Sequence, residues 1–368
     1  MKKVLTGNYA VAEAVKMART EFIAAYPITP QTTIVERLAE MIEKGELDAD
    51  FVRVESEHSA LAAVYGASAS GLRAFTATSS HGLLYMYEMC WWVANSRLPV
   101  VMAIVTRAIG PPWNIYTDHT DILTLRDAGW IISMSENAQE VFDLTLIGFK
   151  VAEKVDLPFA IGLDGFLVSH TAEVVELPDQ KDVDKWLPKR NRDRPFIIEP
   201  GNPINVGGLS TEECSMTIRY EMDKAMRNAR NVIEETGNSY FRKYGLAEEY
   251  KLDDAEYVVI MMGAWCGDAK DAIDILRKEG IQIGMLRLIF VRPFPDKIIE
   301  NLDCKEILVV ERSCSIGKGG IIGSEVKSVA NVPVKNTIAG LGRVDIGVED
   351  FILMFKKFVK GEVKEWWL

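Results

Sequence analysis

The sequence has 368 residues, which suggests two or three domains of about 100 to 200 residues each. Apolar residues make up 48% and charged residues 26%, so the chain can bury a large core and is not mainly disordered. The formal charge of −11 is spread along the chain, which argues against nucleic acid or an anionic membrane as the main partner.

Short apolar runs alternate with helical patterns between residues 20 and 170. Several runs are apolar at successive positions, as in a parallel sheet whose two faces are both covered by helices. The pattern predicts a doubly wound, mostly parallel α/β sheet. The expected strands span 22–28, 51–56, 72–79, 98–106, 130–135 and 157–165, and the expected helices span 33–44, 57–71, 82–96 and 138–154.

The pattern then changes to a charged, proline-bearing connection, followed by a long polar helix with one apolar stripe over 209–245. A second, smaller α/β alternation comes next. Its expected strands span 255–265, 281–290 and 305–313, and its expected helices span 266–280, 296–302 and 324–331. We therefore expect a first α/β domain over 1–175, a linker with the long helix over 176–252 and a second α/β domain over 253–368.

The cysteines and the N-terminus indicate the environment of the chain. The five cysteines are far apart, and no pair has the spacing of metal or cluster ligands. The N-terminal apolar residues are interrupted too often for a signal peptide, and no apolar run reaches about 18 residues. We expect a soluble, cytoplasmic chain with reduced cysteines and no iron–sulfur cluster of its own.

Polar side chains follow four of the predicted strands, where ligands bind in open parallel sheets. These residues are Thr29 after the first strand, Glu55 and Glu57 after the second, Ser79, Ser80 and His81 after the third, and Arg107 after the fourth.

Glu57 is the most informative of these candidates. It begins a helix rich in alanine and serine, and it could simply favour the helix N-terminus or take part in a capping box. Apolar residues on both sides predict instead that its carboxyl group is buried, which would make it a proton partner for a ligand.

Arg107 could bind a substrate carboxylate with its forked guanidinium group, or form a salt bridge to Asp118 or Asp121. The segment 118–121 holds one histidine between aspartates, which is a weak metal ligand set, and we expect a surface or loop-ordering role for it. Trp113 is the aromatic residue that we expect to face a ligand or a partner chain.

The remaining candidates are weaker. The glycine-rich segment 317–323 lacks a nucleotide-binding fingerprint. It could still bind an anion at the N-terminus of the following helix, but tight packing is the favoured interpretation. Trp91 and Trp92 are expected to fill a core between helices. His58 and His81 lie beside the candidate site, where a hydrogen-bonded structural histidine is the common alternative to a functional one.

Several motifs together resemble the α subunit of the 2-oxoacid:ferredoxin oxidoreductases, the pyruvate and 2-oxoisovalerate enzymes. They are GNYAVAEA, AAYPITPQTT, VRVESEHSALAAVYGASASGLRAFTATSSHGLLYMYEM, RLPVVMAIVTRA, DHTDILTLRDAGW and LDGFLVSH, while LRLIFVRPFP and ERSCSIGKGG look like the family's second domain. The resemblance implies that the first domain is the pyrimidine-binding domain of a thiamine diphosphate enzyme. It also implies that the second domain is similar to the C-terminal domain of transketolases.

The resemblance also assigns roles to residues. It implies that Glu57 hydrogen-bonds the aminopyrimidine ring of thiamine diphosphate and exchanges a proton with it. It implies that Thr29 and Arg107 hold the 2-oxoacid. Further cofactor contacts are implied for Pro27, Ile28 and Ser80, and no metal ligand is implied on this chain.

The family's diphosphate-binding GDG motif is missing, since the nearest segment, CGDA at 266–269, lacks the second glycine. The resemblance therefore implies that thiamine diphosphate is shared with a β subunit, and that Mg²⁺ and the [4Fe-4S] clusters lie on partner subunits. The implied partners are β, γ and δ subunits, ferredoxin, a 2-oxoacid and coenzyme A. Thr29 argues against an oxalate enzyme; a 2-oxoglutarate enzyme, an indolepyruvate enzyme and a non-catalytic subunit of the same fold remain alternatives.

Overall fold

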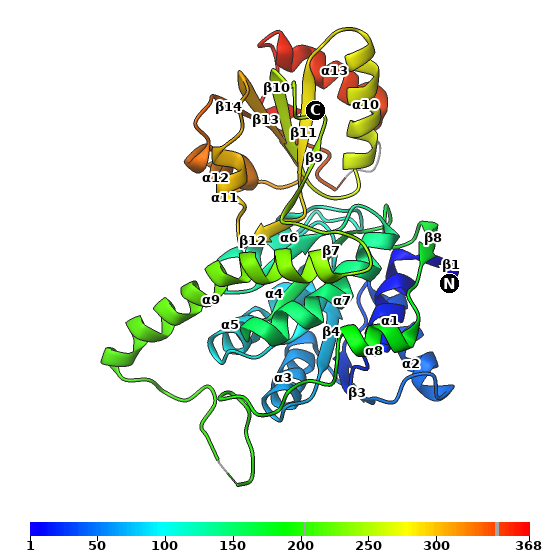
Figure 1. Cartoon of the computed structure of the whole chain (residues 1–368), viewed down its shortest axis with the longest axis vertical. Helices are drawn as coiled ribbons and strands as arrows, with labels where there is room; N and C mark the ends of the chain where they lie inside the picture. The colour runs from blue at the N-terminus through cyan, green and yellow to red at the C-terminus, as the bar shows by residue number, and fades with distance from the viewer. Residues whose placement is uncertain (202, 343–345) are drawn as a thin grey trace.

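The computed structural model describes residues 1–201, 203–342 and 346–368. Two sheets lie in two lobes stacked along the long axis of the molecule (Figure 1). The seven-stranded sheet of the lower lobe has the order β12-β6-β7-β5-β4-β2-β3, and the six-stranded sheet of the upper lobe has the order β15-β14-β13-β10-β11-β9. The fold is therefore α/β with mostly parallel sheets, as predicted.

Each predicted strand of the first domain overlaps a parallel strand of the first sheet. These strands are β2 (Phe22–Ala25), β3 (Asp50–Arg53), β4 (Ala74–Thr78), β5 (Val101–Thr106), β6 (Ile131–Met134) and β7 (Phe159–Asp164). The seventh strand, β12 (Phe290–Arg292), comes from the second part of the chain and pairs antiparallel with β6.

The single strand predicted over 281–290 was wrong. Its first part is β11 (Ile283–Leu288) in the second sheet, and the chain then crosses to the first sheet as β12. Residues 283–290 are all buried, whether they lie in the first or the second sheet, so periodicity carries no signal of the crossing.

Helices cover both faces of the first sheet (Figure 1). The helix predicted over 82–96 is two helices, because the chain turns at Met86. The helices of this part are α1 (Gly7–Met17), α2 (Thr32–Glu43), α3 (Glu57–Ala69), α4 (Ser80–Tyr85), α5 (Tyr87–Asn95), α6 (Thr120–Leu123), the 3-10 helix η1 (Thr124–Asp127), α7 (Ala138–Val155) and α8 (Gln180–Trp186).

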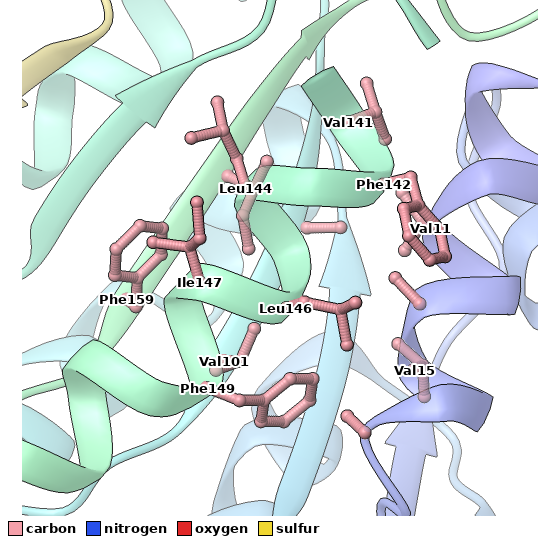
Figure 2. Packing of buried hydrophobic residues seen from close by; sticks show 14 of the residues in the cluster. Val11, Val15, Val101, Val141, Phe142, Leu144, Leu146, Ile147, Phe149 and Phe159 are labelled. Atoms are coloured by element: carbon pink, nitrogen blue, oxygen red, sulfur yellow. The ribbon is translucent and has the colours of Figure 1, made fainter. Parts of the chain in front are cut away.

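The core of the lower lobe is centred on α7. Figure 2 shows Phe142 and Leu146 of α7 directed toward Val11 and Val15 of α1, with Phe159 of β7 beside the same helix. All of these side chains are fully buried. Burial of a large aliphatic or aromatic side chain stabilises a fold by about 1.5 to 3 kcal/mol, so this layer holds the sheet rigidly.

The long helix α9 (Glu212–Ser239) lies within the predicted linker, and its N-terminal part extends away from the lower lobe (Figure 1). Its buried residues all lie in its last 18 positions. Before it, β8 (Ala172–Glu176) pairs antiparallel with the N-terminal strand β1 (Lys2–Thr6).

The upper lobe contains more elements than predicted, because β14, α13 and β15 follow the last expected helix, which ends at residue 331. Its strands are β9 (Ala247–Tyr250), β10 (Tyr257–Met261), β11, β13 (Glu306–Glu311), β14 (Val334–Ala339) and β15 (Trp366–Trp367), and its helices are α10 (Cys266–Lys278), α11 (Asp296–Glu300), α12 (Ile321–Val329) and α13 (Val348–Val359). Among the described residues, no helix is long and apolar enough to cross a membrane.

The glycine-rich turn before α12 closes around a carboxylate of its own lobe. Glu311 accepts hydrogen bonds from the backbone N–H groups of Ile322, at 2.9 Å, and Gly323, at 2.8 Å. A Cβ on Gly320 would lie only 1.9 Å from Glu311 Oε1. These glycines therefore serve close packing, because the helix N-terminus that could bind a ligand anion already holds Glu311.

The two lobes are joined by buried polar contacts. Asp164, at the end of β7, accepts a hydrogen bond from the backbone N–H of Ala264, which follows β10, at 2.7 Å. Arg287 of β11 donates two hydrogen bonds to Glu140 of α7, at 2.9 and 2.6 Å. Paired, buried charges of this kind are costly to separate, so they fix the position of the two lobes relative to each other.

Candidate active site

Four adjacent parallel strands bring the predicted site residues to one edge of the first sheet. The strands β5, β4, β2 and β3 are neighbours in that order. Because parallel strands all end on the same side, the turns that carry Arg107, Ser80, Thr29 and Glu57 lie at one edge.

Glu57 is the first residue of α3, but its side chain takes no part in capping the helix. The preceding Ser56 accepts the N–H of Ser59, at 3.1 Å, and Ser59 in turn donates to exposed Glu55. Glu57 is only 7% exposed, yet within residues 1–201, 203–342 and 346–368 no hydrogen-bond donor or cation contacts its carboxyl group. A buried carboxylate normally has such a partner, so Glu57 is ready to receive one from a ligand.

Gly82 of α4 is what makes room for this carboxyl group. A Cβ at that position would lie 2.6 Å from Glu57 Oε1 and 2.5 Å from Thr78 Oγ1. The hydroxyl groups of Thr78 and Ser79 are both buried and lack hydrogen-bond partners in the described part of the chain. Unsatisfied polar groups thus collect beside Glu57 at the end of β4, as expected where a polar ligand completes the hydrogen bonding.

Arg107 is held at the end of β5 with its charge unpaired by any carboxylate among the described residues. Its guanidinium donates to the carbonyl of Thr29 at 2.5 Å, contacts His81 Nδ1 at 3.0 Å and lies 4.7 Å from the ring centroid of Trp113. Only 4% of the residue is exposed, and burial lowers its pKa although the charge of Asp121 opposes this. The arrangement leaves a desolvated cation available to an anionic ligand.

Asp121 was expected only as a possible salt-bridge partner of Arg107, and its role in the structure is different. Instead of pairing with the guanidinium group, its carboxyl group accepts the backbone N–H groups of Ser80 and Arg107, both at 3.0 Å, and of Ile122 at 2.7 Å. Burial raises its pKa well above the usual value, more than these donors lower it. Ser80 adopts a left-handed φ of 44° and donates its hydroxyl to Ala108 O at 2.5 Å. Asp121 therefore joins two site turns directly.

The turn that carries Thr29 is fixed by two amide side chains. Asn8 donates to Pro30 O at 2.8 Å, and Gln31 accepts the N–H of Ile28 at 3.2 Å while donating to a carbonyl of β4 at 2.9 Å. Asn8 lies in a motif that carried the family resemblance, but nothing in its local sequence predicted this contact. Of the predicted contact residues in the turn, Pro27 and Thr29 are exposed and Ile28 is half-buried.

The segment 118–121 orders the loop but is not at the surface, so that part of the expectation was wrong. His119 and Asp121 are 1% and 0% exposed, and His119 Nε2 lies 2.5 Å from Asp164 Oδ1. The reason is that the loop packs between the two lobes, which a local pattern cannot show. No group of three or more potential metal ligands occurs among the described residues.

The tryptophan and histidine candidates differ in how far they are buried and in what they contact. Trp92 is 44% exposed, so its predicted place in a core was wrong, whereas Trp91 is half-buried and lies beside Arg219. Trp113 is 52% exposed and packs edge-on against His81, with ring centroids 5.7 Å apart. His58 Nε2 lies 3.7 Å from Glu88 Oε2.

An open parallel sheet with unsatisfied polar groups at the carboxyl ends of adjacent strands defines a ligand-binding α/β enzyme subunit. Comparison with known proteins is more specific. Residues 13–238 match the family described as "Pyruvate flavodoxin/ferredoxin oxidoreductase, thiamine diP-bdg", and residues 255–351 match "Pyruvate:ferredoxin oxidoreductase core domain II". The chain belongs to this family of oxidoreductases, and the first match covers its thiamine diphosphate-binding domain.

Relatives of similar length carry two different substrate names. The chain is 43% identical to ketoisovalerate oxidoreductase subunit VorA of Pyrococcus abyssi, over 95% of this chain and 91% of that protein. It is 42% identical to pyruvate synthase subunit PorA of Methanocaldococcus jannaschii, over 98% of this chain and 95% of that protein. The family predicted from the sequence, the α subunits of 2-oxoacid:ferredoxin oxidoreductases, is confirmed, and the chain is one subunit of a multi-subunit enzyme.

Solved structures support the fold. The 2-oxoglutarate:ferredoxin oxidoreductase of Magnetococcus marinus has a TM-score of 0.76 and 21% identity; the match covers 99% of this chain and 65% of that one. A split gene transketolase, described as an inactive beta4 tetramer, has a TM-score of 0.59 and 12% identity, with 97% and 99% covered. The predicted thiamine diphosphate fold with a transketolase-like second part is thus confirmed.

Proposed function

We propose that this chain binds the aminopyrimidine side of thiamine diphosphate and the 2-oxoacid in a CoA-linked 2-oxoacid:ferredoxin oxidoreductase. The products would be an acyl-CoA, carbon dioxide and reduced ferredoxin. The observation that carries the proposal is the buried carboxyl group of Glu57, which has no partner in the described part of the chain.

The residues beside Glu57 fit an aminopyrimidine. Such a ring offers both a donor amino group and acceptor nitrogens, and the free hydroxyls of Thr78 and Ser79 can donate or accept. When bound, thiamine diphosphate supplies the carbon nucleophile that attacks the 2-oxo carbon. Glu57 would hold or return a proton at the pyrimidine ring, because a shielded carboxyl group exchanges protons with a bound base efficiently.

The substrate side is formed by Arg107, Thr29 and Trp113. Arg107 would bind the carboxylate of the 2-oxoacid, for which a buried forked cation is the suited group. Thr29 would be positioned by its anchored turn to contact the oxo group. Pro27, Ile28 and Ser80 would contribute contacts around the cofactor, as the family resemblance implies.

The rest of the enzyme would come from other chains. A β subunit would supply the diphosphate and Mg²⁺ site, and β and δ subunits the [4Fe-4S] clusters that pass electrons to ferredoxin. A γ subunit would complete the complex. The missing GDG motif supports this division.

The acyl group is proposed to be that of 2-oxoisovalerate or pyruvate. Exposed Trp113 beside Arg107 favours a branched chain, since it adds apolar surface at the site. A panel of pyruvate, 2-oxoisovalerate and 2-oxoglutarate at equal concentrations, given to the purified complex, decides between them.

Glu57→Gln tests the proposal within the assembled complex. The variant keeps the shape of the side chain but cannot exchange the proton, so turnover should fall by about 100-fold or more while assembly is unchanged. Glu55→Gln is the matched control, since Glu55 is exposed and pairs only with Ser59. Normal turnover by Glu57→Gln would show that the carboxyl group has no catalytic role and would favour a non-catalytic subunit.

A further inference from the structure

We propose that His81 is a second donor to the substrate carboxylate, acting beside Arg107. This inference rests on the proposed function, because it assigns a further residue to the same substrate. It follows from the two contacts that the His81 ring makes, one at each nitrogen.

The proton position on His81 is set by a backbone group. The N–H of Gly110 points at His81 Nε2, at 3.0 Å. The Gly110 N–H and the Arg107 Nη2–H groups can both only donate, and a neutral imidazole offers one accepting nitrogen. The Gly110 N–H is fixed by the backbone whereas the Arg107 side chain can turn, so we assign the accepting role to Nε2. In the neutral ring the proton is therefore on Nδ1.

This assignment leaves two donors facing each other. His81 Nδ1 lies 3.0 Å from Nη2 of Arg107, which also can only donate. Neither group can accept from the other, so this close contact leaves both N–H groups without an acceptor. A carboxylate oxygen bound beside the two groups would accept from both once the Arg107 fork turns away from the ring, and would relieve the unfavourable contact.

The surroundings of the two donors favour an anion. No carboxylate of the described residues pairs with Arg107, and its Nε is buried without a partner. Trp113 borders both groups, with its ring 5.7 Å from that of His81 and 4.7 Å from the guanidinium carbon. An apolar wall that restricts water makes hydrogen bonds to a charged oxygen stronger. His81 itself remains half-buried, so a small molecule can reach it.

The test compares His81→Ala and His81→Gln with wild type in the intact complex. The measured quantities are kcat and KM for the 2-oxoacid and the apparent binding constant for thiamine diphosphate, called the cofactor constant below. The Ala variant should raise KM about 10- to 100-fold, the usual effect of losing a hydrogen bond to a charged group, and leave the cofactor constant within about twofold. The Gln variant should stay near wild type, because its amide can accept from Gly110 and donate to the carboxylate.

Two controls separate a binding role from a structural one. His170→Gln alters an exposed histidine that contacts Ser169 and Phe166, and it should leave all constants unchanged. If His81→Ala fails to assemble, His81→Met fills the volume without a donor and should raise KM in the same way. An equal rise in the cofactor constant, or no rescue by Gln, would overturn the inference.

Failure of the inference can be told from failure of the proposed function. If the wild-type complex turns over none of the 2-oxoacids, the proposed function itself fails. If the wild-type complex does turn over a 2-oxoacid, and Arg107→Met abolishes turnover while His81→Ala keeps the wild-type KM, only the role of His81 is refuted.

Discussion

Substitution of Gly82 by alanine should disable the site without disrupting the fold. Gly82 lies in α4, and a Cβ there would meet Glu57 Oε1 at 2.6 Å, Glu57 Cγ at 2.9 Å and Thr78 Oγ1 at 2.5 Å. Ordinary contacts with a Cβ begin at about 3.4 Å. The Glu57 side chain must therefore move by close to 1 Å, because it is the flexible partner in this contact.

The size of the effect follows from this displacement. A misplacement of about 1 Å in a catalytic group can cost about 100-fold in rate. Overpacking of a buried site costs about 1 to 3 kcal/mol in the free energy of unfolding, which a chain of this size can tolerate. Turnover should thus fall far more than stability.

The assay compares Gly82→Ala with Gly66→Ala, since both glycines lie in helices. A Cβ on Gly66 would meet nothing within 4 Å, and alanine there should stabilise α3 by about 0.5 to 1 kcal/mol. We expect Gly66→Ala to keep full turnover in the complex, and Gly82→Ala to lose about 99% of it while still assembling. Normal turnover by Gly82→Ala would refute the assignment of Glu57 to the reaction.

Three further outcomes are expected. Asp164→Asn should lower the free energy of unfolding by about 3 to 5 kcal/mol in chemical denaturation, since it removes a buried carboxylate that is hydrogen-bonded to His119 and faces the charge of Arg312. Burial raises the pKa of Asp164, but His119 and Arg312 outweigh this and hold it below the usual value, so the wild-type contribution should be present above about pH 4 and decline as the pH falls further. Gly320→Ala should destabilise the upper lobe by about 1 to 3 kcal/mol, measured by its protection against amide exchange, while leaving the lower lobe unaffected. Trp113→Ala should raise KM for 2-oxoisovalerate more than for pyruvate in the complex; equal changes would remove Trp113 as a determinant of the acyl group.

Local patterns predicted the elements of the first sheet because each strand is a short apolar run and each neighbouring helix an apolar stripe. The predictions from local patterns failed where the tertiary structure determines the place of a segment or a side chain. The run 281–290 divides between two sheets, although residues 283–290 are all buried, as they would be in a single central strand. In the same way, Trp92 borders an open groove formed with residues of the segment 205–219 instead of a closed core, and it stays 44% exposed.

The residues of the candidate site could be selected from the sequence, but the residues that support their turns could not. Thr29, Glu57 and Arg107 follow apolar runs, so the rule for parallel sheets selects them directly. Asn8 reaches across 22 residues to Pro30, and Asp121 across 41 residues to Ser80. Such contacts depend on how the turns meet in space, and a single sequence carries no local signal of them.

The exposure of the site residues is itself an argument for a second chain. Glu57 and Arg107 are almost fully buried, whereas Thr29 and Trp113, which contact or border Arg107, are exposed on the outer side. Thiamine chemistry requires a site closed to water, since water would compete for the reactive carbon and weaken every charged hydrogen bond. Under the proposed function, this chain would supply the buried half of such a site and leave the side at Thr29 and Trp113 open. The exposure of these two residues supports the proposed division of the cofactor between subunits, as does the missing diphosphate motif.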